Sequence, residues 1–198
     1  MHLNFKHPKI NNKKEEKGLS LIESAMVLAL AATVTAGVMF YYQSASDSNK
    51  TQAAISEVMS ATSAINGLYI GQSSYNGLDA SVLKNSSAIP DNYKKNDAIM
   101  NPFGGELKVK TPTVASPAYG YSLELDKLPK SACISLATLN LGTSAAGYGI
   151  NSTALTTNSN GNFDTGTKSK TTAITPAEAA GANGCSKDTD NTVTYYMK

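Results

Sequence analysis

The chain has 198 residues and a formal net charge of +2, which leaves room for one globular domain and an appendage. It is too long to be a membrane peptide alone. It contains no arginine, the side chain that best binds guanine edges and phosphates through paired hydrogen bonds, so nucleic acid is not an expected partner.

The positive charge lies in the leading segment. Residues 1–18 hold five lysines and two glutamates, a net charge of +3, whereas the remainder holds twelve lysines and thirteen acidic residues, a net charge of −1. Both histidines, His2 and His7, lie in the same segment. If this segment is removed, the chain has no imidazole, which excludes histidine-based triads and histidine metal sites. We therefore expect no catalytic residues, no metal and no cofactor.

A long apolar run follows. Between Glu23 and Asp47 lie 23 residues without a formal charge, enough for one transmembrane helix of about 20 residues. Tyr41 and Tyr42 end the run with the aromatic side chains that favour a membrane interface, and lysines precede it. The positive-inside rule predicts a cytoplasmic N-terminus and an exported remainder.

Three explanations compete for this run: a cleaved secretory signal, a plain signal anchor, or a processed anchor with a second use. A secretory signal has an apolar region of about 7 to 15 residues, which is shorter than this run. A plain anchor gives no reason for Glu23, since a charge in the middle of a spanning helix costs about 2.5 to 3.5 kcal/mol. Glu23 is either an interfacial carboxylate that reaches the lipid headgroups or a functional residue.

The helical pattern continues beyond the apolar run. Apolar and small side chains recur at intervals of three and four residues, at Ile55, Val58, Met59, Thr62, Ile65 and Tyr69. No proline occurs between Leu19 and Pro90, and Asn66 with Gly67 is typical of a helix end. We therefore predict one helix from Leu19 to about Asn66, whose second half buries one face in a head domain.

The head is predicted to be an α+β domain. Residues 104–110, 119–125 and 192–197 alternate with the period of strands, and residues 101–105 indicate a turn. Residues 130–141 follow a proline and predict a short helix, and the capping-box sequence from Thr175 to Glu178 predicts another. Residues 151–170 predict an exposed polar loop, and Glu124 with Asp126 predicts a solvated strand edge.

The order KGLSLIE, from Lys17 to Glu23, resembles the processing site of type IV prepilins. In that family a membrane peptidase cuts after the glycine and methylates the new amino terminus, and a glutamate occupies the fifth mature position. The leader of 18 residues and the first mature leucine are similar to the type IVb branch. The segments SEVMSATSAINGLYIGQ, NPFGGEL, SLATLNLGTSA and TAITPAEAA closely resemble the bundlin family of major pilins, least so at 84–117 and 151–170.

The resemblance implies a set of site residues. Cleavage would fall between Gly18 and Leu19, and Leu19 would carry the N-methyl group. Glu23 would pair with the α-amino group of Leu19 on a neighbouring subunit and fix the register of assembly. Cys133 and Cys185 lie outside the membrane in the predicted topology, where two thiols normally pair, and type IVb pilins carry one disulfide in this part of the head.

The implied fold is that of type IV pilins, a long N-terminal helix packed on a head with an antiparallel sheet and short helices. Residues 1–18 would be a cleaved leader, residues 19–70 the long helix with a transmembrane and polymerisation segment at 19–42, and residues 71–198 the head.

The implied function is that of a major pilin, which forms surface fibres for cell aggregation and adhesion. Its partners would be copies of itself, the prepilin peptidase, the assembly platform, minor pilins, the inner membrane before assembly and host-cell surfaces. It would lie in the inner membrane with a cytoplasmic N-terminus and then in an extracellular pilus. The alternatives are a minor pilin or pseudopilin of a secretion or conjugative thin-pilus system, and a membrane-tethered enzyme, for which no catalytic constellation can be assembled.

Overall fold

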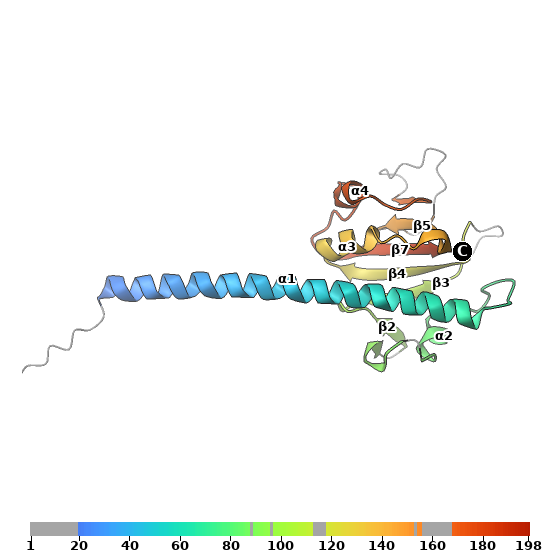
Figure 1. Cartoon of the computed structure of the whole chain (residues 1–198), viewed down its shortest axis with the longest axis horizontal. Coiled ribbons are helices and arrows are strands. Elements are labelled where there is room, and N and C mark those ends of the chain that lie inside the picture. The colour runs from blue at the N-terminus through green and yellow to red at the C-terminus, as the bar shows by residue number, and fades with distance from the viewer. Residues whose placement is uncertain (1–19, 88, 96, 113–117, 153, 156–167) are drawn as a thin grey trace, which may run out of the picture. The chain divides into compact units, whose positions relative to one another are not determined.

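The structure is a computed structural model that describes residues 20–87, 89–95, 97–112, 118–152, 154–155 and 168–198. The chain divides into two compact units, Met1–Gln43 and Ser44–Lys198. One α-helix, α1 (Leu21–Leu68), begins in the first unit and ends in the second (Figure 1). The predicted long helix is confirmed, but it ends two residues beyond Asn66, and the chain turns at Gly71, which has φ 80°.

The second unit buries one stripe of α1. The buried side chains of the helix are Ala54, Glu57, Val58, Ala61 and Ile65. The predicted stripe is therefore only partly right, because Met59 is 55% exposed. The stripe was predicted from large side chains, whereas the helix packs through two alanines that the pattern did not include.

The head contains a seven-stranded antiparallel sheet in the order β1-β2-β3-β4-β7-β5-β6. Its strands are β1 (Lys94–Lys95), β2 (Ala98–Met100), β3 (Glu106–Lys110), β4 (Tyr121–Leu128), β5 (Ala145–Ile150), β6 (Ser169–Lys170) and β7 (Asn191–Met197). The last strand in the sequence thus lies between β4 and β5, so the C-terminus of the chain closes the centre of the sheet.

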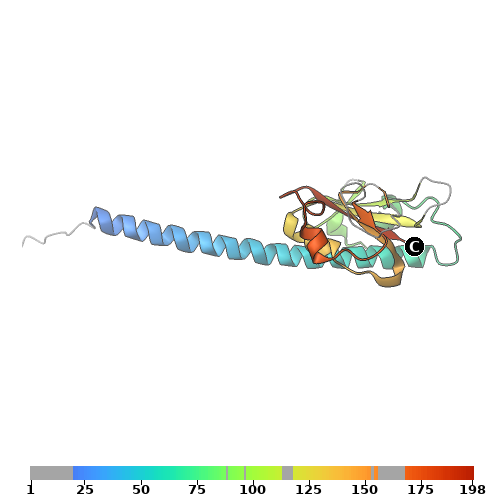
Figure 2. The ribbon, with the colours of Figure 1, turned by 90° about the horizontal axis from the view of Figure 1, so that it is seen from above.

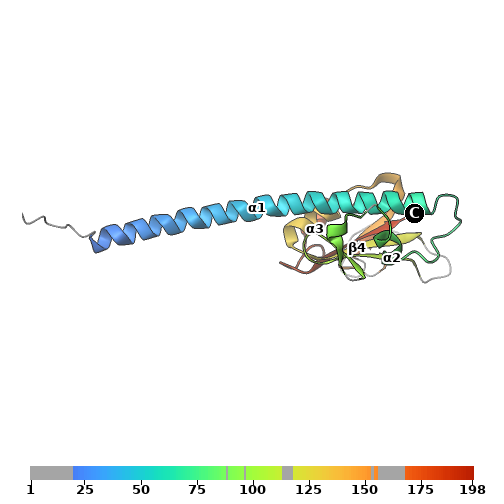
Figure 3. The same ribbon diagram turned by 90° about the horizontal axis from the view of Figure 1, so that it is seen from below.

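One face of the sheet is apolar and covered by helices. The register pairs Leu107 with Leu125 and Leu123 with Tyr195, and all four side chains are buried. The C-terminal part of α1 lies along one side of the sheet in two perpendicular views (Figures 1 and 2). The view from below also places it on that side (Figure 3). The helix α3 (Lys130–Ala137) adds to this cover, since the Tyr195 hydroxyl donates to the Leu136 carbonyl at 2.7 Å.

The opposite face of β3 and β4 is charged. Lys110 pairs with Glu124 at 2.8 Å, and Lys108 pairs with Asp126. The hydrogen bond that the Lys108 ammonium donates to the Asp126 carboxylate raises the pKa of Lys108 above its ordinary value. The prediction of a solvated strand edge at Glu124 and Asp126 is wrong, because β4 is an interior strand and the two carboxylate side chains are only 13% and 18% exposed.

The three predicted strands are present with shifted bounds. β4 starts two residues later than predicted and continues to Leu128, with an irregular register after Leu125 and positive φ at Lys127. The helix α3 ends at Ala137, four residues short of the predicted end. Leu139 and Leu141 still pack on the core, but outside the helix, with the Leu141 amide donating to the Tyr148 hydroxyl at 2.9 Å.

The second predicted helix is confirmed as α4 (Pro176–Ala180). Thr175 accepts a hydrogen bond from the Glu178 amide, and the Glu178 side chain accepts one from the Thr175 amide, which completes the capping box. The exposed loop predicted for 151–170 is wrong at its end, because Ser169 and Lys170 form the buried strand β6. Lys170 pairs with Glu178 at 2.7 Å and so fastens α4 to that strand. Residues 153 and 156–167 lie outside the described residues.

The remaining helical segments are short and were not predicted from the sequence. They are α2 (Ala80–Lys84) and the two 3-10 turns η1 (Asp91–Tyr93) and η2 (Gly142–Ser144).

The predicted turn before β3 is confirmed and is built around Asn101. The Asn101 side chain accepts hydrogen bonds from the Phe103 and Gly105 amides, at 2.9 and 3.1 Å, and donates to the Asp126 carbonyl at 2.8 Å. The turn therefore holds the start of β3 against β4.

Gly105→Ala should destabilise the second unit by about 1 to 3 kcal/mol, because its Cβ would overlap the Asp126 carbonyl and the Asn101 amide. The matched control is Gly67→Ala in α1, where nothing lies within 4 Å of the new Cβ, and which should stabilise by about 0.5 to 1 kcal/mol. Urea unfolding of the detergent-solubilised full chain, followed by circular dichroism, compares the two. Equal stability of the two variants would contradict this packing.

Candidate functional site

The first unit presents an apolar helical surface. Large apolar side chains along α1 are 61–88% exposed, at Leu21, Ile22, Met26, Val27, Leu28, Leu30, Val34, Val38, Met39, Phe40, Tyr41 and Tyr42. By length and composition α1 is able to cross a membrane, and none of its most apolar 18-residue window is buried. Such a surface needs lipid or another apolar partner to remove it from water.

The serine and threonine hydroxyls of Ser24, Thr33 and Thr35 in this segment donate to carbonyls of the helix itself. Thr33 donates to the Ala29 carbonyl at 2.9 Å, and Thr35 donates to the Ala31 carbonyl at 2.7 Å. Ser24 likewise donates to the Leu21 carbonyl at 3.1 Å. A polar group in an apolar environment needs such a partner. These residues therefore leave the segment compatible with lipid.

Glu23 is the exception in this apolar surface. Its side chain is exposed in the first turn of α1, and its Oε2 atom accepts a hydrogen bond from the Ser20 amide at 3.0 Å. This bond satisfies one of the free amides at the start of the helix. Among the described residues, no cation forms an ion pair with Glu23. The carboxylate can therefore accept a cationic partner beyond the described residues.

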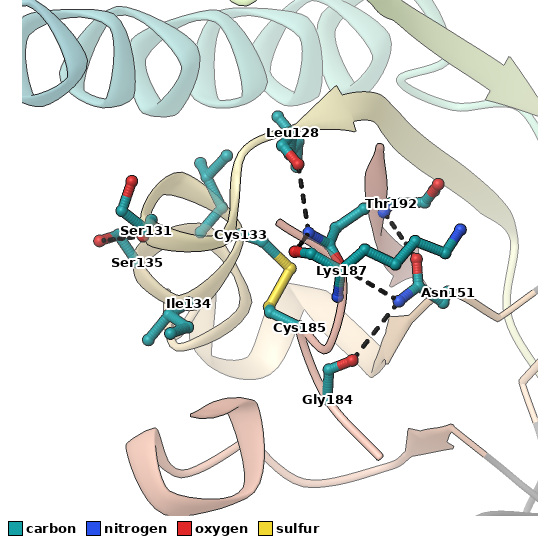
Figure 4. The surroundings of a disulfide bond; sticks show 12 residues. Leu128, Ser131, Cys133, Ile134, Ser135, Asn151, Gly184, Cys185, Lys187 and Thr192 are labelled. Atoms are coloured by element: carbon teal, nitrogen blue, oxygen red, sulfur yellow. Dashed lines mark hydrogen bonds between the residues drawn. A yellow bond between two sulfur atoms is a disulfide. The ribbon is translucent and has the colours of Figure 1, made fainter. Parts of the chain in front are cut away.

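A disulfide between Cys133 and Cys185 fastens the C-terminal part of the head (Figure 4). It joins α3 to the segment before β7, and both cysteines are fully buried. Beside it, the buried Asn191 side chain donates to the Lys187 carbonyl at 2.7 Å and to the Leu128 carbonyl at 3.3 Å. The predicted disulfide is thus confirmed, and hydrogen bonds reinforce it on the β7 side.

Removal of the disulfide by the double substitution Cys133→Ser and Cys185→Ser should lower the free energy of unfolding by about 4 kcal/mol in the chain-entropy model. The two cysteines are 52 residues apart, so the bond restricts a long loop in the unfolded chain. Thermal unfolding in detergent, with and without a thiol reductant, measures the effect. Reduction should lower the midpoint of the natural chain and leave that of the double variant unchanged. Equal midpoints of the natural chain and the double variant without reductant would contradict the prediction.

The comparisons with known proteins agree with this architecture. The family model of bundlin matches residues 43–198. The chain belongs to the bundlin family. Two proteins, each named "Major structural subunit of bundle-forming pilus", from Escherichia coli O111:H- and O127:H6 (strain E2348/69 / EPEC), are 68% identical to it. In both cases the match covers 96% of this chain and 98% of the relative.

A solved structure supports the fold of this bundlin-family chain. The crystal structure of the type IV b pilin from Salmonella typhi matches with a TM-score of 0.50 and 17% identity, over 73% of this chain and 98% of that chain. At this identity the match concerns the fold alone. The long helix, antiparallel sheet and short helices are those of a type IV pilin, as the sequence predicted.

The predicted site residues of this bundlin-family chain fall into three groups. Gly18 and Leu19, where cleavage and methylation are predicted, lie outside the described residues. Glu23 lies in the exposed first turn of α1, and its role in register stays a prediction. Cys133 and Cys185 are bonded to each other. Among the described residues, no group of three or more acidic, cysteine or histidine side chains could hold a metal ion.

Glu57, a buried carboxylate of this bundlin-family chain, was not predicted from the sequence. Glu57 lies in the buried stripe of α1 and is only 4% exposed. Among the described residues, neither of its carboxylate oxygens has a hydrogen-bond partner. Burial therefore raises its pKa from 4.5 to about 8. The signal in the sequence was its spacing, three residues after Ala54 and four before Ala61, inside the stripe.

Proposed function

We propose that this chain is the major structural subunit of a bundle-forming type IVb pilus. Two relatives named as the major structural subunit of the bundle-forming pilus are 68% identical to it, and the match covers 98% of their length. The observation that carries the proposal is the exposed apolar segment of α1, none of whose most apolar window is buried and which continues in one helix into a folded pilin head. The segment can lie in lipid before assembly and against copies of itself afterwards, because both environments are apolar.

The domain organisation follows the predicted processing. Residues 1–18 form a leader that a prepilin peptidase removes, residues 19–70 form the long helix with its membrane and polymerisation segment at 19–42, and residues 71–198 form the head. Before assembly the chain spans the inner membrane once with its N-terminus in the cytoplasm. The lysines of residues 1–18 and the exposed apolar surface of α1 support this orientation.

Glu23 sets the register of assembly in this proposal. Its carboxylate would pair with the α-amino group of the methylated Leu19 on a neighbouring subunit. Two opposite charges in a surrounding of low dielectric stabilise each other, and a misplaced subunit would leave a buried charge without a partner. The exposed position of Glu23 and its freedom from ion pairs within the described chain support this role.

The other partners follow from the same role. The assembly platform and minor pilins would bring the subunit into the fibre, and the finished fibre would bind other cells and host-cell surfaces. We expect no catalysis from the mature chain, because no catalytic constellation can be assembled from a sequence that after residue 18 contains no histidine and no arginine.

Deletion and stoichiometry test the proposal. A strain that lacks this chain should have no fibres in electron micrographs, and the gene in trans should restore them. In wild-type cells the chain should be the dominant protein of sheared surface fibres. A trace amount in those fibres would assign it instead to the minor pilins, and fibres that persist without it would contradict the proposal.

A further inference from the structure

The second unit has an uncharged groove of about 400 Å³ between the last turns of α1 and the loop after α3. Met59 from α1, Leu141 from the loop and Met197 from β7 supply its apolar lining, and the rest of the lining consists of uncharged polar side chains of α1 and of the segment after α3. This volume exceeds the roughly 150 Å³ that holds a benzene molecule in an apolar cavity. Methionine side chains adapt their shape to irregular apolar partners. The groove can therefore receive an aliphatic side chain.

An exposed apolar side chain lies at another place on the same unit. Ile70, just after the end of α1, is 83% exposed. Among the described residues of the second unit, the exposed large apolar side chains are Met59, Leu68 and Ile70. All three fall within residues 59–70. A single exposed apolar side chain is ordinary, but a concentration in one short segment indicates a contact surface.

No side chain that lines the groove is charged, and neither is Ile70; the exposed Lys198 follows Met197, and its amide donates to the Ser144 carbonyl at 2.9 Å. The sequence has no charged residue from Val58 to Leu78, nor from Ser131 to Ile150, and these two stretches supply Ile70 and most of the groove. When identical subunits meet, like charges at the contact repel each other. Ile70 and the groove can meet without burial of a charge.

The arrangement favours a second copy of this chain as the occupant. A side chain and a groove at different places on one molecule form a heterologous contact, which generates open helical assemblies when the rotation does not close. One wall of the groove is α1 itself, the helix whose apolar N-terminal segment assembly would bury.

We propose that Ile70 of one subunit packs into this groove of the next subunit, against Met59 and Leu141. The inference rests on the proposed function, because it requires subunits side by side in a fibre. This contact between the heads of neighbouring subunits would add specificity to the association of their α1 segments.

The contact is tested by introducing opposite charges at Met59 and Ile70 in the full chain, expressed with its own assembly machinery. Met59→Glu and Ile70→Lys should each lower the subunit recovered in sheared fibres at least about tenfold, because each buries an unpaired charge in the contact. The combined variant Met59→Glu/Ile70→Lys should restore the yield to within about threefold of the natural chain, because the two charges then pair. The membrane pool and its disulfide should stay unchanged in all three, since both positions are exposed.

Matched charge controls are Thr171→Glu and Thr171→Lys at an exposed position outside both surfaces, which should leave the yield unchanged. Normal fibres from both single variants would overturn the inference, as would a combined variant no better than the singles. A loss as large from the Thr171 variants would also overturn it, because any added charge would then be sufficient. If the natural chain is absent from sheared fibres, the proposed function fails before this contact is tested.

Discussion

The variant Glu23→Ala should be processed, inserted and folded normally while the yield of sheared fibres falls about a hundredfold or more. The substitution removes the carboxylate, so each incoming subunit would bury the neighbouring α-amino group without a partner. Loss of one member of a buried pair costs about 3 to 5 kcal/mol, and about 1.4 kcal/mol is a factor of ten in association. Immunoblots of sheared and membrane fractions measure the effect directly.

Glu23→Gln separates two roles of this side chain. The glutamine carbonyl can still accept the hydrogen bond that Glu23 accepts from the Ser20 amide, but it has no charge for an ion pair. If Glu23 sets the register, Glu23→Gln should lose fibres as Glu23→Ala does. Ser24→Ala, one residue further along the same exposed turn, should assemble normally. Fibres of normal yield from Glu23→Gln would show that the side chain only caps the helix and would contradict the register role.

The free energy of unfolding should fall by about 3 to 4 kcal/mol between pH 5 and pH 8 through Glu57 alone. Burial raises the pKa of Glu57 in the folded chain to about 8, against 4.5 as the ordinary value. Below pH 4.5 the Glu57 carboxyl is protonated in both the folded and the unfolded chain, so the free energy of unfolding has not yet fallen. As the pH rises the unfolded chain ionises first, so stability is lost progressively up to about pH 8.

Glu57→Gln removes this dependence because the amide does not ionise. Denaturant unfolding of the full chain in detergent at pH 5, 6.5 and 8 should give a flatter profile for the variant than for the natural chain. Asp188→Asn, at an exposed position, should keep the natural profile. The pKa of Asp79 is lowered by hydrogen bonds, of which that from the Ser81 hydroxyl has the largest effect. The contribution of Asp79 to stability therefore changes only at a pH more acid than 5. A natural chain equally stable at pH 5 and pH 8 would contradict the burial of an unpaired carboxyl.

The sequence predicted those parts of the fold that follow a regular pattern over many residues. The long helix followed from an uninterrupted apolar and amphipathic pattern, and β3, β4 and β7 from strand alternation. The capping box at Thr175 was a local signal with its own hydrogen bonds, so it predicted α4 correctly. Strands of two or three residues, such as β1 and β6, contain too few positions to show a period. Their pairing depends on partners far away in the sequence.

The errors arose where tertiary contacts decided the outcome. Leu139 and Leu141 continued the helical spacing of α3, but they contact the core from a turn that Tyr148 holds. Glu57 resembled a solvent-facing position because a charged residue is rarely buried without a partner. Lys170 belonged to a polar stretch, yet its pairing with Glu178 buries it.

The candidate site was predictable to different degrees. The disulfide followed from two exported cysteines and the family resemblance. The processing site and the role of Glu23 came from a short motif that only a second subunit or the peptidase would complete. The groove beside Met59 has no sequence signature, because it forms between α1, the loop at Leu141 and the end of β7.

Intact-mass measurement tests the central claim most directly. The protein is taken from cells that carry their own assembly machinery, and membranes are compared with sheared surface material. We expect a species that begins at Leu19, one methyl group heavier and two hydrogens lighter than the unmodified sequence, in both fractions. That result would establish cleavage, N-methylation, the disulfide and presence in the fibre together. A species that retains residues 1–18, or one that begins beyond Tyr42, would show an ordinary anchor or signal and contradict the account.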